Sequence, residues 1–178
     1  MNDEQKYLFD LQGYILLKGV VPDAVVNSCN AALDRFESMD PADYPTPLCL
    51  GAERTDGNLY ISNILEGDEV FRSLIDLPEV IDVVAEVTGA PYRLNHTYTI
   101  YRWDGGYTGM HMSGTPVIPK CQYRCHDGQM MSTLTKAVFP LLDCAEKDGC
   151  FAVIPGAHKS NFARPWGRHP EENPPLVG

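Results

Sequence analysis

The chain has 178 residues with 24 acidic and 14 basic side chains, so its formal net charge is −10, and its isoelectric point is about 4.8. This negative charge argues against nucleic acid as a partner, since phosphates bind to cationic surfaces. Hydrophobic residues make up 44% of the chain, which suits one packed core and excludes a disordered chain, while 15 glycines and 14 prolines indicate many turns and disfavour a pure helix bundle.

The N-terminal sequence MNDEQK is charged and lacks the apolar core of a signal peptide. No later stretch approaches the roughly 18 to 20 apolar residues that span a bilayer. These features predict a cytoplasmic protein without a membrane span. Six widely spaced cysteines favour reduced thiols over disulfides: Cys29, Cys49, Cys121, Cys125, Cys144 and Cys150.

The first half of the chain, residues 1–90, is predicted to be mainly helical. Apolar residues recur at helical spacing over 25–36 and predict an amphipathic helix with one packed stripe. Two shorter helices are predicted over 68–75 and 79–88, the second framed by a proline and a glycine. Helices are therefore expected to precede the main sheet.

Extended structure is predicted at four places. Residues 14–21 (YILLKGVV) are apolar and β-branched enough for a strand, whereas residues 40–58 are rich in Pro, Asp and Gly and predict a long loop. Residues 92–101 alternate between apolar and polar types, as a half-buried strand does. Residues 134–142 and 150–154 predict further strands.

The alternation over 92–101 assigns side chains to two faces of the predicted strand. The apolar face contains Tyr92, Leu94, His96, Tyr98 and Ile100, and the polar face contains Arg93, Asn95, Thr97, Thr99 and Tyr101. On the apolar face, His96 is interpreted as a packed, hydrogen-bonded core residue instead of a metal ligand.

Common nucleotide-binding and serine-hydrolase motifs are missing from the sequence, which has no GxGxxG after a strand, no Gly-Lys-Ser/Thr loop and no GxSxG elbow. Cys121, Cys125 and His126 have no second Cys/His pair at zinc-site spacing, so an exposed turn with two thiols is favoured over a zinc site. His111 differs in its setting, because the segment GMHMSGTP follows the polar-faced strand after a glycine-rich turn.

Two blocks of sequence carry a resemblance to a known family. The segment YLFDLQGY at residues 7–14 resembles the opening of phytanoyl-CoA dioxygenase-like proteins, and GCFAVIPGAHKSNF at residues 149–162 is similar to that family's Pro-Gly-Ser-His-Lys block. The two blocks stand in the family's order and near the two ends of the chain, so the resemblance covers essentially the whole chain. The resemblance implies a mainly β fold with N-terminal α-helices, a double-stranded β-helix (jelly roll, cupin-like). It also implies Fe(II), with 2-oxoglutarate and O₂ as cosubstrates.

The resemblance also implies a metal site, from which this sequence departs twice. The family holds iron with His-x-Asp/Glu and a distant His, a facial triad that leaves three positions open. His111 corresponds to the first ligand, but Ser113 occupies the carboxylate position. The distal His and the arginine that binds 2-oxoglutarate follow the Pro-Gly-Ser-His-Lys block in the family, so we expect both to be absent here.

The sequence is therefore interpreted as a single domain over residues 1–178 whose C-terminal strands are missing. Residues 1–90 would form the helical N-terminal region, and residues 91–178 the first part of an incomplete jelly roll. No oligomeric state is predicted.

The resemblance suggests roles for five further residues. His158 corresponds to a residue that orders the site in the family, and a metal-ligand role is the alternative. Phe139 stands near the position where the family often has a Trp against the cosubstrate, and an inward core position is its alternative. Asn95, Thr97 and Tyr101 could donate hydrogen bonds to a carboxylate of 2-oxoglutarate, or be satisfied interior polar residues.

The implied function is hydroxylation of a small organic substrate with decarboxylation of 2-oxoglutarate to succinate. Ser113 and the missing downstream ligand favour an alternative, a catalytically inactive jelly-roll binding or scaffold domain. A halogenase is a third hypothesis, because relatives that halogenate also lack the carboxylate ligand.

Overall fold

The computed structural model describes residues 1–89, 91–111, 121–145 and 148–172. Its elements are three α-helices, two small antiparallel sheets and short 3-10 helices, and within the described ranges no closed barrel forms. In chain order, the α-helices and strands are α1 (Asp3–Gln12), α2 (Asp23–Ser38), β1 (Cys49–Leu50), β2 (Asn58–Ser62), α3 (Pro78–Thr88), β3 (Tyr98–Arg102), β4 (Tyr123–His126) and β5 (Gln129–Ser132). The 3-10 helices are η1 (Pro41–Asp43), η2 (Ile64–Glu66), η3 (Glu69–Leu74), η4 (Ala157–Lys159) and η5 (Pro170–Glu172).

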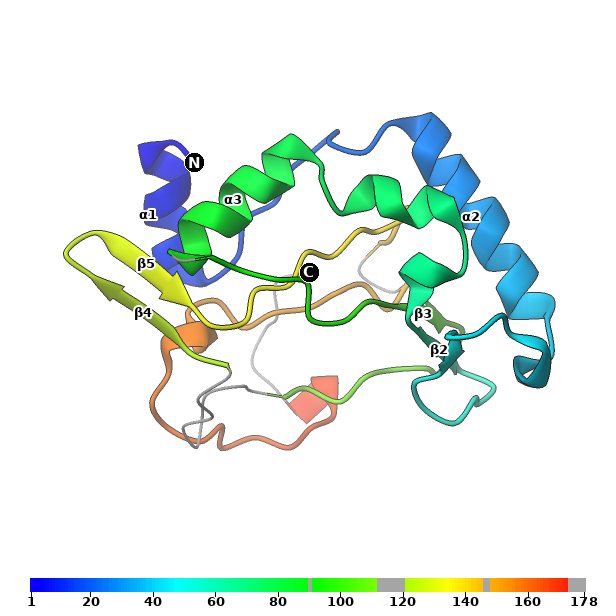
Figure 1. The fold of residues 1–178 in the computed structure, drawn as a ribbon. Helices are drawn as coiled ribbons and strands as arrows, with labels where there is room; N and C mark the ends of the chain where they lie inside the picture. The colour runs from blue at the N-terminus through cyan, green and yellow to red at the C-terminus, as the bar shows by residue number, and fades with distance from the viewer. Residues whose placement is uncertain (90, 112–120, 146–147, 173–178) are drawn as a thin grey trace.

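One region is built on α2 and the sheet β1-β2-β3, which lie together at one end of the molecule (Figure 1). Leu59 and Ile61 of β2 are fully buried, and they share a hydrophobic cluster with the apolar stripe of α2. That stripe consists of Cys29, Ala32, Leu33 and Phe36. The helix predicted from the spacing over 25–36 is thereby confirmed, and its stripe faces the sheet's cluster.

The second region lies at the other end and contains α1, α3 and the hairpin β4–β5 (Figure 1). Its cluster has only three buried members, Phe9 of α1, Val87 of α3 and Met130 of β5. The hairpin turns at Asp127 and Gly128, whose φ angles are 49° and 75°, as a two-residue turn matched to the twist of its strands requires.

Several sequence-based expectations were wrong. Residues 14–21 form no strand, and Leu16 is 69% exposed there. Residues 134–142 and 150–154 form no strand of either sheet. An apolar composition predicted extended chain at these places, but within the described ranges none of them joins either sheet, and Val153 alone among them takes part in a bridge. The predicted loop over 40–58 contains two short regular elements, η1 and β1.

The two faces of the predicted strand over 92–101 are inverted. Only β3 forms a strand, and its Tyr101 pairs with Leu59 of β2 and packs against the α2 cluster. Ile100, expected to be buried, is 39% exposed. His96 is also exposed, so its interpretation as a core residue was wrong. Leu59 and Ile61 decide which face of the sheet is covered, because paired residues of antiparallel strands share a face.

The helix predicted over 79–88 is α3, which begins at Pro78 and ends at the left-handed Gly89. The helix predicted over 68–75 is the 3-10 helix η3. None of the helices in the described part of the chain is long and apolar enough to cross a membrane.

Candidate functional site

His111 lies nine residues beyond β3, at the end of a described segment, and its side chain is exposed. Its ring Nδ1 is 3.2 Å from the carbonyl oxygen of Gly109. The neighbouring Met110 donates its N–H to the carbonyl of Arg168 at 2.7 Å and accepts a hydrogen bond from the guanidinium of Arg164 at 3.0 Å. A segment more than 50 residues downstream therefore holds the backbone that carries His111.

The predicted iron triad is not assembled among the residues that the structure describes. Ser113 lies outside them. Within the described ranges, no group of three or more His, Cys, Asp or Glu side chains could hold a metal ion. Because an Fe(II) site of this class needs two imidazoles and a carboxylate on one face, the donor set present here does not fit the metal by itself.

His158 turns both ring nitrogens towards α1. Its Nε2 is 3.1 Å from the carbonyl oxygen of Asp10, so this nitrogen carries the proton and donates it. Its Nδ1 is buried, has no hydrogen-bond partner among the described residues and lies next to Gly13. Burial, and then the positive charge of Lys159, lower the pKa of His158. These contacts are those of a neutral, positioned imidazole, and a metal role for His158 stays a prediction.

Asp10 stands at the centre of a polar cluster that joins the two family-like sequence blocks. Its carboxylate accepts a hydrogen bond from the Tyr123 hydroxyl at 2.7 Å and lies 3.5 Å from the ammonium of Lys159. Its backbone carbonyl accepts from the same ammonium at 2.6 Å and from His158. The bond from Tyr123 is the largest cause that lowers the pKa of Asp10.

The local sequence explains why α1 needs this downstream partner. Asn2 caps the start of the helix with its side chain, and Gly13 ends it in the left-handed conformation at φ 86°. The last four carbonyls of a helix have no donors within the helix. Here Gly156 donates its N–H to the carbonyl of Gln12 at 2.9 Å, and His158 and Lys159 donate hydrogen bonds to the carbonyl of Asp10.

The other predicted site residues separate into two pairs. Tyr101 and Phe139 both pack against the α2 cluster. The hydroxyl of Tyr101 is buried and finds no hydrogen-bond partner in the part of the chain that the structure describes, and burial raises its pKa. Asn95 and Thr97 are not members of that cluster, since Asn95 donates its amide to His96 at 2.8 Å and the carbonyl of Thr97 accepts from the backbone N–H of Asn63. Tyr101 and Phe139 thus share one cluster, while a common role of all four residues towards a cosubstrate stays a prediction.

Sequence reasoning missed Asp10 and Tyr123. Their contact spans 113 residues, and although Asp10 lies in the block at 7–14, no role was assigned to it and Tyr123 stood in no recognised motif. The available signal was Gly13 at the end of an apolar run, which marks a helix end with free carbonyls. This signal does not indicate which part of the chain donates hydrogen bonds to those carbonyls.

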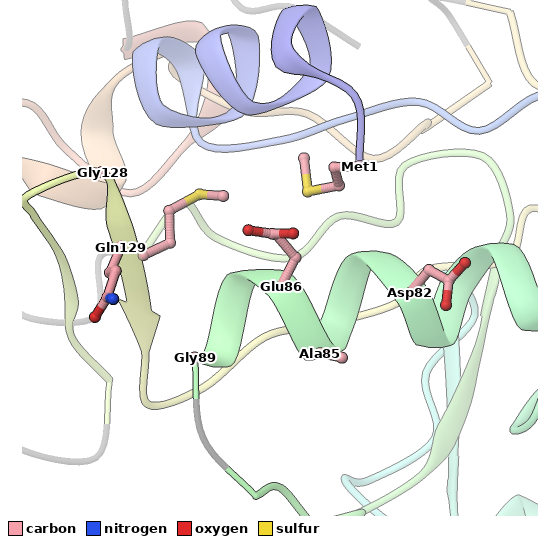
Figure 2. A pocket seen from close by; sticks show the side chains of 8 residues that line it. Met1, Asp82, Ala85, Glu86, Gly89, Gly128 and Gln129 are labelled. Atoms are coloured by element: carbon pink, nitrogen blue, oxygen red, sulfur yellow. The ribbon is translucent and has the colours of Figure 1, made fainter.

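A separate hollow of about 590 Å³ lies between the start of α1, α3 and the turn of the hairpin (Figure 2). Glu86 projects from α3 towards Met1 in this hollow and forms an ion pair with Lys6 at 2.9 Å. None of the predicted site residues lines it. The hollow therefore belongs to a different part of the surface from His111 and His158.

Comparisons with known proteins give consistent results. The family model of phytanoyl-CoA dioxygenase matches residues 9–175. Two crystal structures of HygX from Streptomyces hygroscopicus superpose with TM-scores of 0.69 and 0.63 at 22% identity, a likeness of fold. Each superposition covers 91% of this chain and 63% of the HygX chain. No curated protein matches the chain significantly by sequence.

Both HygX structures contain nickel and 2-oxoglutarate, and one also contains hygromycin B. A metal and 2-oxoglutarate are the pair that the sequence predicts. The chain spans less than two thirds of the HygX chain, so the match concerns a part of that protein.

Proposed function

We propose that this chain, which belongs to the phytanoyl-CoA dioxygenase family, acts as an Fe(II)- and 2-oxoglutarate-dependent oxygenase on a small organic substrate. The observation that carries the proposal is the family match over residues 9–175, which confirms the resemblance read from residues 7–14 and 149–162. The proposed reaction is hydroxylation of the substrate with decarboxylation of 2-oxoglutarate. The proposed complete fold is the jelly roll of the family.

His111 is the residue that we propose as a metal ligand, since it is an exposed imidazole on a backbone held by residues 164–168. Iron bound with 2-oxoglutarate would supply the oxidising chemistry. What this chain itself contributes is the fixed backbone at Met110 and the positioned, neutral imidazole of His158. Roles of Asn95, Thr97, Tyr101 and Phe139 towards 2-oxoglutarate remain predictions.

A second candidate function is a binding or scaffold domain without catalysis. It is favoured by Ser113 at the carboxylate position and by the described ranges, within which no three-ligand metal cluster forms. The two candidates differ in one measurable property, the metal-dependent binding of 2-oxoglutarate.

Anaerobic titration with Fe(II) and 2-oxoglutarate tests the proposal. An oxygenase site is expected to give a charge-transfer absorption band in the visible region, and the variant His111→Ala is expected to abolish it. His126→Ala is the matched control, because the His126 side chain is 92% exposed on the hairpin and should leave the band unchanged. If the unmodified chain gives no band, the scaffold function is supported instead.

A further inference from the structure

We propose that Asp10 is a positioning residue through which helix α1 fixes the hairpin β4–β5 and the segment 155–159 in one arrangement. The proposal rests on the proposed function in one respect: segment 155–159 matters for a site because it matches the family's Pro-Gly-Ser-His-Lys block. The arrangement itself is argued from contacts within this chain.

The oxygens of Asp10 serve different segments. The carboxylate accepts the hydroxyl of Tyr123, the first residue of β4. The backbone carbonyl accepts Nε2–H of His158 and the ammonium of Lys159. Asp10 therefore connects α1 to two segments that lie 113 to 149 residues further along the chain. A displacement of α1 at Asp10 has to displace both of the others.

Apolar rings surround the partners of Asp10, although the side chains of Asp10 and Lys159 are each 42% exposed. Phe9 is 8% exposed, and its ring lies 6.1 Å from that of Tyr123 and 6.4 Å from that of His158. The rings of Tyr123 and His158 are 4.7 Å apart. The bond from the half-buried Tyr123 to the carboxylate is charge-assisted, and such bonds are stronger than those between neutral groups. The ammonium of Lys159 also lies at the C-terminal end of α1, where the helix dipole favours a positive charge.

A second ion pair on the same helix provides a contrast. Lys6 and Glu86 pair at 2.9 Å and join α1 to α3, with side chains 37% and 33% exposed. The two residues of this pair belong to α1 and α3, so the ion pair itself includes no residue of β4 or of segment 155–159. The Asp10–Lys159 pair is at least as exposed, so water screens both ion pairs, and the contrast lies in the segments that they join. The Lys6–Glu86 pair joins α1 to α3, whereas Asp10 joins α1 to β4 and to segment 155–159. Glu86 is therefore the control position.

Hydrogen exchange followed by mass spectrometry tests the arrangement. In Asp10→Ala, which retains a good helix former in α1, exchange of amides in 123–132 is expected to rise about tenfold, with a smaller rise in 154–160. Asp10→Asn keeps an oxygen that can accept from Tyr123 and is expected to recover most of the hairpin's protection. Glu86→Gln is expected to leave both segments unchanged. Unchanged exchange in Asp10→Ala, or an equal effect of Glu86→Gln, would overturn the proposal.

Binding of 2-oxoglutarate in the presence of nickel(II), measured by calorimetry, tests the link to the site. Asp10→Ala is expected to bind about tenfold more weakly than the unmodified chain, and Asp10→Asn is expected to restore part of the loss. If Asp10→Ala loosens both segments but binds 2-oxoglutarate normally, Asp10 is structural only and the positioning role is wrong. If the unmodified chain binds no 2-oxoglutarate, the proposed function fails, and the exchange experiment still decides whether Asp10 fixes the two segments.

Discussion

The two ends of the molecule are held together by different forces. Around α2 and the three-stranded sheet, eleven buried hydrophobic residues form one cluster. Around α1, α3 and the hairpin only three of the described residues are buried in the cluster, and polar contacts of Lys6, Asp10 and Gln12 add further connections. Apolar burial depends on volume and tolerates variation, whereas a hydrogen bond depends on distance and direction. The arrangement of the second region is therefore expected to depend more on the exact position of single polar atoms.

The largest effect is expected in the α2 region. Ile61→Ala removes buried methyl groups from a side chain with no exposed surface and is expected to lower the free energy of unfolding by about 4 kcal/mol. Urea unfolding followed by circular dichroism measures it. Leu16→Ala is the control, because this side chain is 69% exposed and its loss is expected to cost under about 0.5 kcal/mol. Similar costs for both variants would contradict the picture of an apolar core.

The second largest effect is expected at Gly13. An added Cβ there would lie 2.3 Å from Nδ1 of His158, and the backbone has a φ of 86°. Gly13→Ala is expected to cost about 3 kcal/mol, the sum of backbone strain and a collision with the ring.

Gly19→Ala separates the two causes. Gly19 also has a positive φ, 69°, but no atom lies within 4 Å of its added Cβ. It is expected to cost only about 1 kcal/mol, the strain alone. Equal melting temperatures for the two variants would show that His158 does not pack against Gly13.

An intermediate effect is expected at Asp68 in the α2 region. Its carboxylate accepts the N–H of Val70 at 3.0 Å, which caps η3, and pairs with Arg35 of α2 at 2.5 Å. These contacts lower the pKa of Asp68. Asp68→Ala is expected to reduce stability by about 1 kcal/mol, as the loss of a helix cap does. Glu69→Ala, one residue further along an exposed turn, is expected to change the melting temperature much less.

The smallest effect is a pH dependence in the second region. Burial lowers the pKa of His158 below its ordinary value of 6.5, so the folded chain binds this proton less readily than the unfolded chain. The stability contributed by the neutral ring is present above pH 6.5 and is lost as the pH falls through the folded pKa. Asp10, whose pKa is lowered from 3.8, adds a further loss at lower pH.

Unfolding at about pH 5.5 and at about pH 7.5 measures this dependence. The unmodified chain is expected to be less stable at the lower pH, and His158→Gln is expected to show a smaller difference between the two conditions. An undiminished difference in His158→Gln would assign the effect to another group.

Local sequence patterns predicted one helix in each region, α2 and α3, better than they predicted the strands. The spacing over 25–36 identified α2, because a helix that packs on one side repeats its apolar residues locally. Pro78 and Gly89 marked the ends of α3 for the same local reason. The faces of β3 were inverted because Tyr101 is polar in type but packs against Leu59, a partner 42 residues away in sequence.

In the second region the decisive contacts are distant in sequence. The dipeptide Asp127-Gly128 is typical of a two-residue hairpin turn, but no hairpin was predicted there from the sequence. The resemblance identified the blocks at 7–14 and 149–162, but sequence alone did not indicate that they touch. Asp10 meets Tyr123 and Lys159 only after the whole intervening chain has folded.

The dependence of α1 on Gly156, His158 and Lys159 sets an order of events on the ribosome. Isolated helices of ten residues are marginal in water, and α1 has ten. Its terminal carbonyls keep water as their partner until a donor 149 residues later has been synthesised. At roughly 10 residues per second this delay is about 15 seconds, during which the nascent α1 offers its apolar side chains to chaperones.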